Sequence, residues 1–306
     1  MNIAYMEPLE RAWRHARQML FRPFNLATWF VLGFSAWLAN LMDGGGGGFP
    51  RPPQRGFRFR AADIGDPVRE AWSWVGGQPH LAALIGGAAV FGVALALVLL
   101  WLSSRGKFVF LDNVLHRRAR IVEPWGRYRR QGNSLFLWRV GFFFVTVALF
   151  AAVAGLMLAM GGGLSGLGFG SPRAVTVTLV GAALGFLLLL GMIYVALFVD
   201  SFVTPLMARH DLTATAAWAM LLPWIEAHLG AFVLYGLFVL FWWLLVGLAV
   251  VAAGLLTCCI GFLVLAMPYV GTVLLLPVYV TYRAFSLEFL AQFDPSLNAL
   301  PASQTE

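Results

Sequence analysis

Residues 116–133, "HRRARIVEPWGRYRRQGN", concentrate positive charge in one segment of a very apolar chain. The segment holds six arginines, one glutamate and one histidine, while only 11% of the whole chain is charged and 60% is hydrophobic. Guanidinium groups bind phosphate through paired N–H bonds, and tryptophan and tyrosine favour the headgroup level of a membrane. We therefore predict a binding surface for anionic phospholipid. Its candidate residues are Arg117, Arg118, Arg120, Trp125, Arg127, Tyr128, Arg129 and Arg130.

Two other interpretations of this segment stay open. It could dock an acidic protein partner, or its arginines could do no more than hold a loop on the cytoplasmic side. Near an anionic leaflet each basic residue contributes about 1 kcal/mol. The topological role needs only a few arginines, so we favour the lipid interpretation. Pro124 can start a helix, and we expect the sequence PWGRYRR to lie along the membrane surface.

Three charged residues, Arg139, Asp200 and Arg283, stand at the ends of long apolar runs. Charge near hydrocarbon must be paired or must reach water, so such residues can form a polar gate or an ion path. They can also form an Asp–Arg pair, or arginines whose long side chains reach the interface and fix helix depth. We favour the second interpretation, and we expect all three residues at the inner boundary of the membrane.

Sequence patterns typical of enzymes and metal sites do not occur. The five histidines are scattered, without a pair at the helical spacing that suits a metal ion. Cys258 and Cys259 are adjacent and do not form a CxxC spacing. There is no GxSxG, P-loop or HExxH motif. We therefore predict no catalytic residue, no metal and no cofactor, and a protein that is not an enzyme.

Length and composition predict an all-α integral membrane protein with six transmembrane helices. The mean hydropathy is +0.79, and a spanning helix needs about 20 apolar residues. Six runs qualify, without the alternation that strands would show. They are approximately Asn25–Met42, Leu81–Leu102, Leu135–Met160, Val175–Val199, Leu229–Leu256 and Ile260–Tyr282. In such a protein a net charge of +7 indicates anionic lipid rather than nucleic acid as the partner.

The distribution of basic residues predicts the orientation. With the N-terminus inside, the inner segments hold fifteen arginines and lysines and the outer segments hold six. This bias favours a bacterial inner membrane with both termini cytoplasmic. We expect one domain, 1–306. It would comprise an interfacial helix at 1–23, a flexible Gly/Pro/Arg-rich loop at 43–60, a basic cytoplasmic loop at 103–134 and a tail at 283–306.

Several shorter patterns predict how the helices pack. Pro8–Leu20 is amphipathic, which indicates a helix in the membrane plane; its apolar face would hold Leu9, Trp13, Ala16 and Leu20. Gly181 and Gly185 form a GxxxG motif, typical of close helix packing. Pro268 and Pro277 are expected to bend the sixth span.

A weak internal repeat relates "KFVFLDNVLHRRARIVEPWGRY" to "SFVTPLMARHDLTATAAWAML". Phe108 and Val109 align with Phe202 and Val203. The repeated unit would be a short surface helix followed by two spans.

The sequence also resembles a known group of proteins through "LFRPFNLATWFVLGFSAWL", "SSRGKFVFLDNV", "GNSLFLWR", "DSFVTPLM" and "LPVYVTYRAFSLEFLAQF". These pieces are similar to uncharacterised bacterial polytopic membrane proteins, and those resemble the membrane domain of glycerophosphoryl diester phosphodiesterases. The resemblance implies a six-helix bundle with interfacial helices. It implies no catalytic site, because the soluble phosphodiesterase domain does not occur in this sequence.

These observations favour a non-enzymatic inner-membrane protein. We expect a lipid-interacting scaffold or an accessory subunit of a membrane assembly, with anionic phospholipid and a membrane protein as partners. A small-molecule or lipid transporter is the alternative, favoured by the bent spans and the repeat. The lack of an acidic residue at the centre of any span argues against proton-coupled transport. A membrane-embedded enzyme that acts on lipids is the least favoured interpretation.

Overall fold

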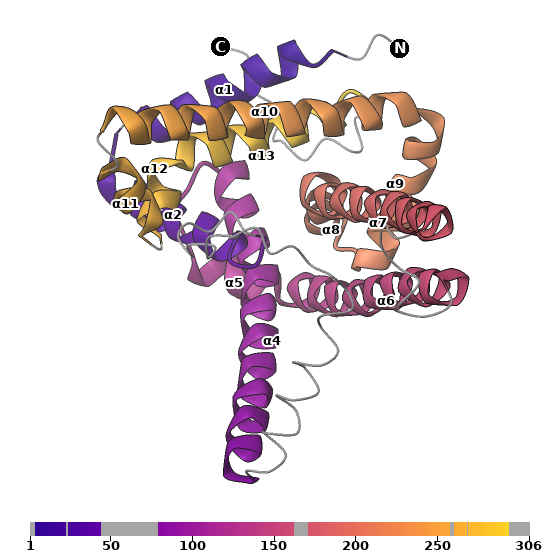
Figure 1. Ribbon diagram of the computed structural model, residues 1–306. Helices are drawn as coiled ribbons and strands as arrows, with labels where there is room; N and C mark the ends of the chain where they lie inside the picture. The colour runs from indigo at the N-terminus through magenta and orange to yellow at the C-terminus, as the bar shows by residue number, and fades with distance from the viewer. Residues whose placement is uncertain are drawn as a thin grey trace. The chain divides into compact units, whose positions relative to one another are not determined.

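The computed structural model describes residues 4–22, 24–43, 79–161, 171–257, 260–267 and 269–293. Helices joined by short turns make up this part of the chain, and it contains no strand (Figure 1). In chain order the elements are α1 (Met6–Phe21), α2 (Leu26–Ala39), α4 (Pro79–Leu115), α5 (Val122–Arg127), α6 (Arg129–Gly161), α7 (Pro172–Phe198), the π-helix η3 (Val199–Val203), α8 (Thr204–His210), α9 (Ala214–Ala227), α10 (Leu229–Leu256), α11 (Ile260–Ala266), α12 (Val270–Leu274) and α13 (Leu276–Leu290). The loop expected at 43–60, except Asp43, lies outside the described residues. So do the tail beyond Phe293, Cys258, Cys259 and Pro268.

Four helical segments in the described part are long and apolar enough to cross a membrane: His80–Leu115, Arg129–Gly161, Pro172–His210 and Leu229–Leu256. At most 11% of the most apolar stretch of each segment is buried inside the protein. Apolar side chains that face outward along a whole helix are what a hydrocarbon environment requires. The all-α fold is confirmed, and these four helices are those of a membrane protein.

The count of six spans is not confirmed. The first expected span is the 14-residue helix α2, which reaches roughly 21 Å at about 1.5 Å per residue, less than a hydrocarbon core of about 30 Å. Asn25 caps this helix by accepting a hydrogen bond from the Ala27 N–H at 2.9 Å. The sixth expected span is divided into α11, α12 and α13. Pro277 lies in the first turn of α13, where a proline costs no helical hydrogen bond, so it begins a helix rather than bending one.

The chain divides into two compact units. The first comprises 1–50, 99–138 and 196–306, and the second comprises 51–98 and 139–195. The helices α4, α6 and α7 each pass from one unit to the other along the sequence. The first unit contains α1, α2, α5 and α8–α13, together with most of the candidate site residues.

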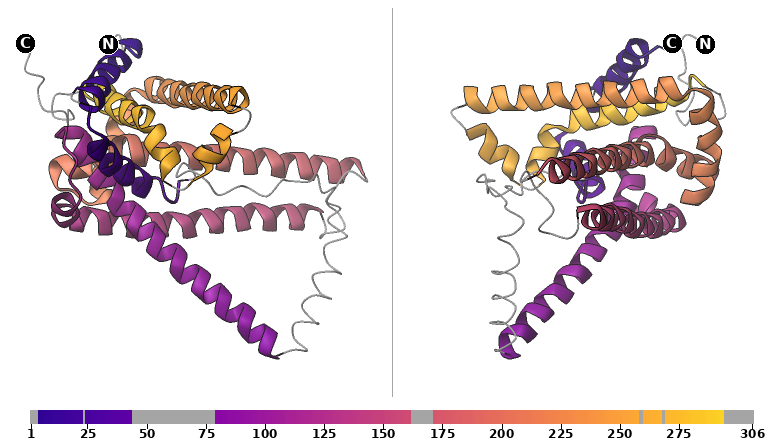
Figure 2. Two further views of the ribbon diagram at one scale, coloured as in Figure 1. Left: turned by 90° about the vertical axis from the view of Figure 1, so that its left-hand side faces the viewer. Right: turned by 45° about the vertical axis from the view of Figure 1, so that its right-hand side comes forward.

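An aromatic cluster joins η3, α10 and α13 in the first unit. The ring of Tyr235 lies 4.8 Å from that of Phe202, 4.6 Å from Phe289 and 5.5 Å from Phe285. All four side chains are buried, and α10 and α13 run side by side (Figure 2). The cluster therefore fixes η3, which holds Asp200, against α13, which holds Arg283.

The amphipathic helix α1 packs lengthwise on α13. Arg11 pairs with Glu288 at 3.3 Å across this contact. Ala12 and Ala16 are fully buried, whereas Trp13 is 46% exposed. The buried face of α1 is thus centred on alanines rather than on Trp13, because small residues let two helices approach closely.

The last turns of α4 pack against α2. A Cβ atom at Gly106 would lie 2.8 Å from the backbone nitrogen of Ala39, so only glycine fits at this crossing. The Ser103 hydroxyl donates to the Ala39 carbonyl at 2.9 Å. This close approach places the residue after Gly106, Lys107, beside the C-terminal end of α2.

In the second unit, only one glycine of the GxxxG motif makes a close contact. A Cβ atom at Gly181 would lie 2.1 Å from Sδ of Met157 on α6, whereas one at Gly185 would have no neighbour within 4 Å. Gly181 therefore marks where α7 packs against α6.

The two segments of the internal repeat share local structure. In both, a buried helix end carries a fully buried phenylalanine, Phe108 or Phe202. In both, a residue with positive φ follows the helix: Arg117 at 49°, two residues beyond the end of α4, and Asp211 at 55°, directly after α8. The alignment of Phe108 with Phe202 also aligns Arg117 with Asp211. A short helix follows in each case, α5 or α9.

Candidate functional site

The arginine-rich segment is folded back on the end of α4. After the helix ends at Leu115, the Arg118 N–H donates to the Asn113 carbonyl at 3.1 Å. The Arg120 N–H donates to the Asn113 side-chain oxygen at 2.9 Å. The expected loop at 103–134 is therefore mostly helical: it contains the last turns of α4, a short turn, α5 and the start of α6.

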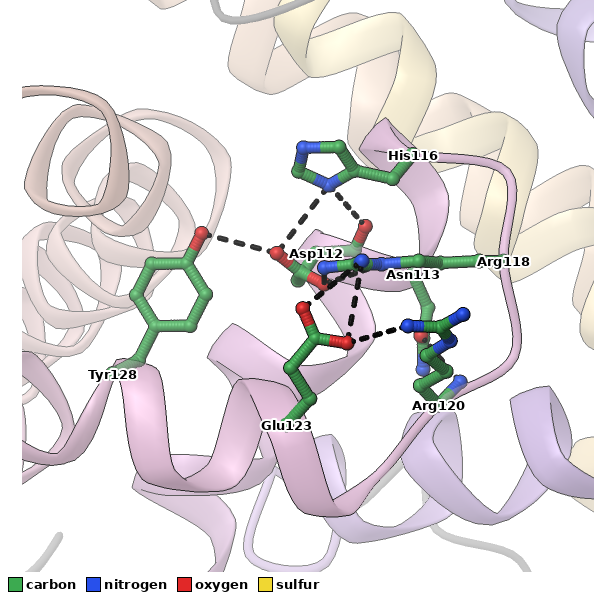
Figure 3. A network of polar contacts seen from close by, with 7 residues as sticks. All are labelled: Asp112, Asn113, His116, Arg118, Arg120, Glu123 and Tyr128. Carbon is green, nitrogen blue, oxygen red and sulfur yellow. Dashed lines mark hydrogen bonds and ion pairs between the residues drawn. The ribbon is translucent and has the colours of Figure 1, made fainter.

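Asp112 is the centre of a polar network on α4 (Figure 3). Its carboxylate is fully buried and accepts hydrogen bonds from Arg118 Nη2 at 2.9 Å, Arg118 Nε at 3.2 Å and the Tyr128 hydroxyl at 3.1 Å. His116 Nδ1 lies 3.3 Å from the same carboxylate. A buried carboxylate is tolerated only when donors or a cation replace its water. Asp112 is therefore the anchor of the segment, and it was not among the residues singled out from the sequence.

Glu123 on α5 neutralises two of the six arginines, and one of these also binds Asp112. Arg120 Nη1 donates to Glu123 at 2.8 Å, and Arg118 Nη1 donates to it at 3.2 Å. The hydrogen bond from Arg120 is the main reason why the pKa of Glu123 lies below its usual value. The hydrogen bond to Asp112 correspondingly raises the pKa of Arg118. These two arginines already have anionic partners within the protein.

The two aromatic candidates face the protein rather than the headgroups. Tyr128 is 7% exposed and stacks on Phe108 at 5.7 Å. Burial raises the pKa of the Tyr128 hydroxyl to about 12. Trp125 packs edge-on against Trp101 at 6.0 Å. Both residues therefore hold α5 and the start of α6 on α4.

Four arginines remain, and all are exposed. We call three of them, Arg127, Arg129 and Arg130, the arginine triplet. All three are exposed, and none has an acidic partner among the residues that the structure describes. Arg127 lies over the ring of Tyr128 at 5.6 Å. Arg117, by contrast, contacts His15 Nδ1 on α1 at 3.3 Å.

Arg105 is a buried cation near the triplet. It is 8% exposed, and its guanidinium carbon lies 4.4 Å from the ring centroid of Trp101. Its Nη2 donates to the Asn133 side-chain oxygen at 3.1 Å. Within the described ranges Arg105 has no acidic partner, and its Nε has no hydrogen-bond partner. The charge of Arg105 is therefore not neutralised by the described part of the chain.

A depression of about 580 Å³ opens between the start of α6 and the start of α9, and we call it the α6–α9 pocket. Its polar wall consists of Arg130, Asn133, Ser134, Thr213 and Thr215. The Ser134 hydroxyl oxygen accepts from the Ala214 N–H at 3.0 Å, which ties the two helices together. The apolar wall includes Leu137 and Trp138.

The charged residues expected at the inner boundary form a second cluster, in part. Arg283 donates to the backbone carbonyl of Asp200, and the Asp200 carboxylate pairs with Lys107, which also pairs with Asp43. In the π-helix η3 the hydrogen bonds reach one residue further back than in an α-helix. The Thr204 N–H therefore donates to the Val199 carbonyl, and the Asp200 carbonyl can accept from Arg283 instead. Arg139 lies in the second unit. The sequence alone did not indicate a role for Lys107, because it lies 93 residues from its partner Asp200 along the chain.

The Lys107 cluster borders a cavity of about 20 Å³, lined also by Asn40, Tyr279 and Tyr282. That volume is enough for about one water molecule. Among the described residues no group of three His, Cys, Asp or Glu side chains comes together as a metal site would require. The residues that line the α6–α9 pocket carry one guanidinium group, one amide and three hydroxyl groups, and none of them carries a carboxylate.

Comparison with known proteins gives one match. The model of a family of unknown function, DUF7544, matches residues 4–293. No curated protein and no solved structure matches the chain. None of these comparisons links the chain to glycerophosphoryl diester phosphodiesterases, so that part of the resemblance is not confirmed. Because the match spans nearly the whole sequence, the chain belongs to the DUF7544 family of unknown function.

Proposed function

We propose that this protein is a non-enzymatic protein of the bacterial inner membrane that binds anionic phospholipid through the arginine triplet. It would act as a lipid-interacting scaffold or as an accessory subunit of a membrane assembly. One observation supports this most strongly. Of the six arginines from Arg117 to Arg130, Arg118 and Arg120 pair with Asp112 and Glu123, and Arg117 contacts His15. The other three are exposed and have no acidic partner in the described chain.

The size of the effect follows from charge near a membrane. A basic residue next to an anionic leaflet contributes about 1 kcal/mol, so three contribute about 3 kcal/mol. That corresponds to a change in lipid binding on the order of 100-fold. Because the triplet is exposed, the attraction falls with increasing salt.

The test replaces the triplet with neutral residues of similar length. In the variant Arg127→Gln, Arg129→Gln, Arg130→Gln, twelve of the fifteen inner basic residues remain, so the topology is expected to persist. The purified variant should retain less phosphatidylglycerol and cardiolipin than the parent, measured by mass spectrometry of extracted lipid.

The matched control is Arg14→Gln, Arg17→Gln, Arg22→Gln, which removes the same charge from the exposed surface near α1. It should keep the lipid content of the parent. If the triplet variant also keeps the parental lipid content, the proposal is wrong. If both variants lose lipid equally, the net charge and not the triplet determines binding, which also contradicts the proposal.

The proposed orientation keeps the six-span arrangement, in which the first apolar run, 25–42, crosses the membrane, and both termini and the triplet lie on the cytoplasmic side. In a background in which Cys258 and Cys259 are replaced by serine, His80→Cys should react with a membrane-impermeant thiol reagent in intact cells. Gln18→Cys should react only after the cells are opened. The reverse labelling pattern would overturn the orientation.

A transporter is the second candidate, and one observation favours it. The charged cluster of Lys107, Asp43 and Asp200 borders a small cavity close to α13, and α11, α12 and α13 interrupt the sixth apolar run. Discontinuous helices beside charged groups are typical of transport sites. Alternating access predicts that Asn40→Cys, in the same cysteine-free background, reacts with the impermeant thiol reagent both in inverted and in right-side-out vesicles, so that it is reached from either side of the membrane. Reaction from one side only counts against transport.

A further inference from the structure

The α6–α9 pocket lies beside a buried positive charge that the described chain does not neutralise. The guanidinium of Arg105 is buried, stacks on Trp101 and has no carboxylate partner there. Burial of an unpaired cation is costly because the protein interior cannot replace water around the charge. Since Gly132 has no side chain, Arg105 can pass close to α6; a Cβ atom at Gly132 would lie 2.7 Å from Cγ of Arg105.

Asn133 connects Arg105 to the pocket. Its side-chain oxygen accepts from both Arg105 Nη2 and Trp101 Nε1, each at 3.1 Å. The oxygen is therefore occupied, and the amide NH₂ group is what Asn133 has left to donate. Asn133 lines the pocket, so one residue joins the buried cation to the pocket wall.

The polar wall of the pocket consists of hydrogen-bond donors. Arg130 donates from a guanidinium, and the Ser134 hydroxyl can donate because its oxygen already accepts from Ala214. The hydroxyls of Thr213 and Thr215 lie 3.2 Å apart, and one of them remains free to donate outward. No carboxylate lines the pocket. Several donors around one pocket that no carboxylate lines suit a group with several anionic oxygens, which a phosphate has.

The other wall indicates an apolar substituent on that phosphate. Leu137 is 67% exposed, and Trp138 stacks on Trp218 at 5.9 Å. A volume of about 580 Å³ lies within the usual range for a bound small molecule or headgroup. Inorganic phosphate would leave this wall unused, whereas the glycerol and first methylene groups of a phospholipid would cover it.

We propose that the α6–α9 pocket binds the phosphate of one anionic phospholipid, with its glycerol end against Leu137 and Trp138. The bound phosphate would supply the negative charge that Arg105 and Arg130 lack. This inference rests on the proposed function, and it adds a defined lipid of fixed stoichiometry to a surface that attracts anionic lipid in general. The triplet gathers anionic lipid, and the pocket selects one molecule.

The test introduces a carboxylate into the pocket. Thr215→Glu places an acidic side chain in the first turn of α9, where it favours the helix and so leaves folding intact. The new carboxylate should compete with the phosphate. The affinity for the most tightly bound phosphatidylglycerol molecule should fall by about tenfold. Native mass spectrometry of the full chain in mild detergent, with added phosphatidylglycerol, counts the molecules bound and gives their affinity.

Two controls accompany this variant. Thr215→Ser keeps the hydroxyl and should retain the tight lipid, and Gln18→Glu makes the same charge change on exposed α1 and should also retain it. Phosphatidylcholine and inorganic phosphate, added in separate arms, should not occupy the tight site. If inorganic phosphate binds as tightly as the lipid, the apolar wall takes no part and the lipid assignment is overturned.

The outcomes separate this inference from the proposed function. If the tightly bound lipid persists in Thr215→Glu, the pocket is not its binding site, even where the triplet variant has lost bulk anionic lipid. Equal loss in Thr215→Glu and Gln18→Glu overturns it too, because net charge then explains the binding. Unchanged lipid content in the triplet variant contradicts the proposed function, whatever the Thr215 variants do.

Discussion

Replacing Asp112 by asparagine should destabilise the protein by about 3 kcal/mol. Asp112 is fully buried and accepts two bonds from Arg118, at 2.9 and 3.2 Å, and one from Tyr128 at 3.1 Å. Hydrogen bonds to a charged group contribute about 1.5–3 kcal/mol, and breaking a buried ion pair costs about 3–5 kcal/mol. The lower end applies here because asparagine still accepts from Tyr128, and Arg118 keeps its contact with Glu123.

The assay is unfolding of the purified protein in detergent with increasing sodium dodecyl sulfate, followed by circular dichroism. A double-mutant cycle with Arg118→Gln isolates the pair. If Asp112 and Arg118 form the anchor, the double variant loses less stability than the sum of the two single variants. Arg127→Gln, which removes an arginine without an acidic partner in the described chain, should change stability by less than about 0.5 kcal/mol. Additive effects of Asp112→Asn and Arg118→Gln, within about 0.5 kcal/mol, would refute the reasoning.

Three further predictions follow from single residues. Burial lowers the pKa of His15 below 6.5, so the folded state favours the neutral ring. The free energy of unfolding should therefore fall as the pH drops below that value. His15→Gln should remove this pH dependence in the same unfolding assay. Burial raises the pKa of Tyr128 from 10.0 to about 12, so its contribution is complete below pH 10 and is lost as pH rises through about 12; Tyr128→Phe should flatten this alkaline loss, and an unchanged alkaline profile would contradict the assignment. Gly181→Leu should lower the melting temperature more than Gly185→Leu, because a large side chain at Gly181 needs more room than the end of the flexible Met157 side chain can give up, whereas Gly185 has no neighbour within 4 Å; equal effects would place the helix contact elsewhere.

The sequence predicts the long apolar helices well, because length and hydropathy alone define a membrane-spanning helix. It predicts the first and the sixth of the expected spans less well. α2 is a short helix whose end residue, Asn40, returns hydrogen bonds to its own last turn. The sixth run is interrupted because Pro277 begins a helix at a turn. Neither feature alters hydropathy over a long window, so neither could be read from composition.

The arginine-rich segment was recognisable from the sequence, but its division into two roles was not. Arg118 and Arg120 are structural because Asp112 and Glu123 meet them, and Asp112 lies in a helix that the apolar pattern had already explained. Tyr128 is buried rather than interfacial, since it stacks on Phe108. Arg105 could be recognised only by the lack of an acidic neighbour in the folded structure.

The central claim is that the arginine triplet contacts anionic headgroups in the membrane. Modification by phenylglyoxal, followed by peptide mass spectrometry, measures how accessible each arginine is in the unaltered protein. The protein would be placed in nanodiscs of phosphatidylcholine, with or without phosphatidylglycerol. Phosphatidylglycerol should slow the modification of Arg127, Arg129 and Arg130, while Arg14, which pairs with Glu10 on α1, should react at the same rate in both. Equal rates for the triplet in the two kinds of nanodisc would contradict the claim.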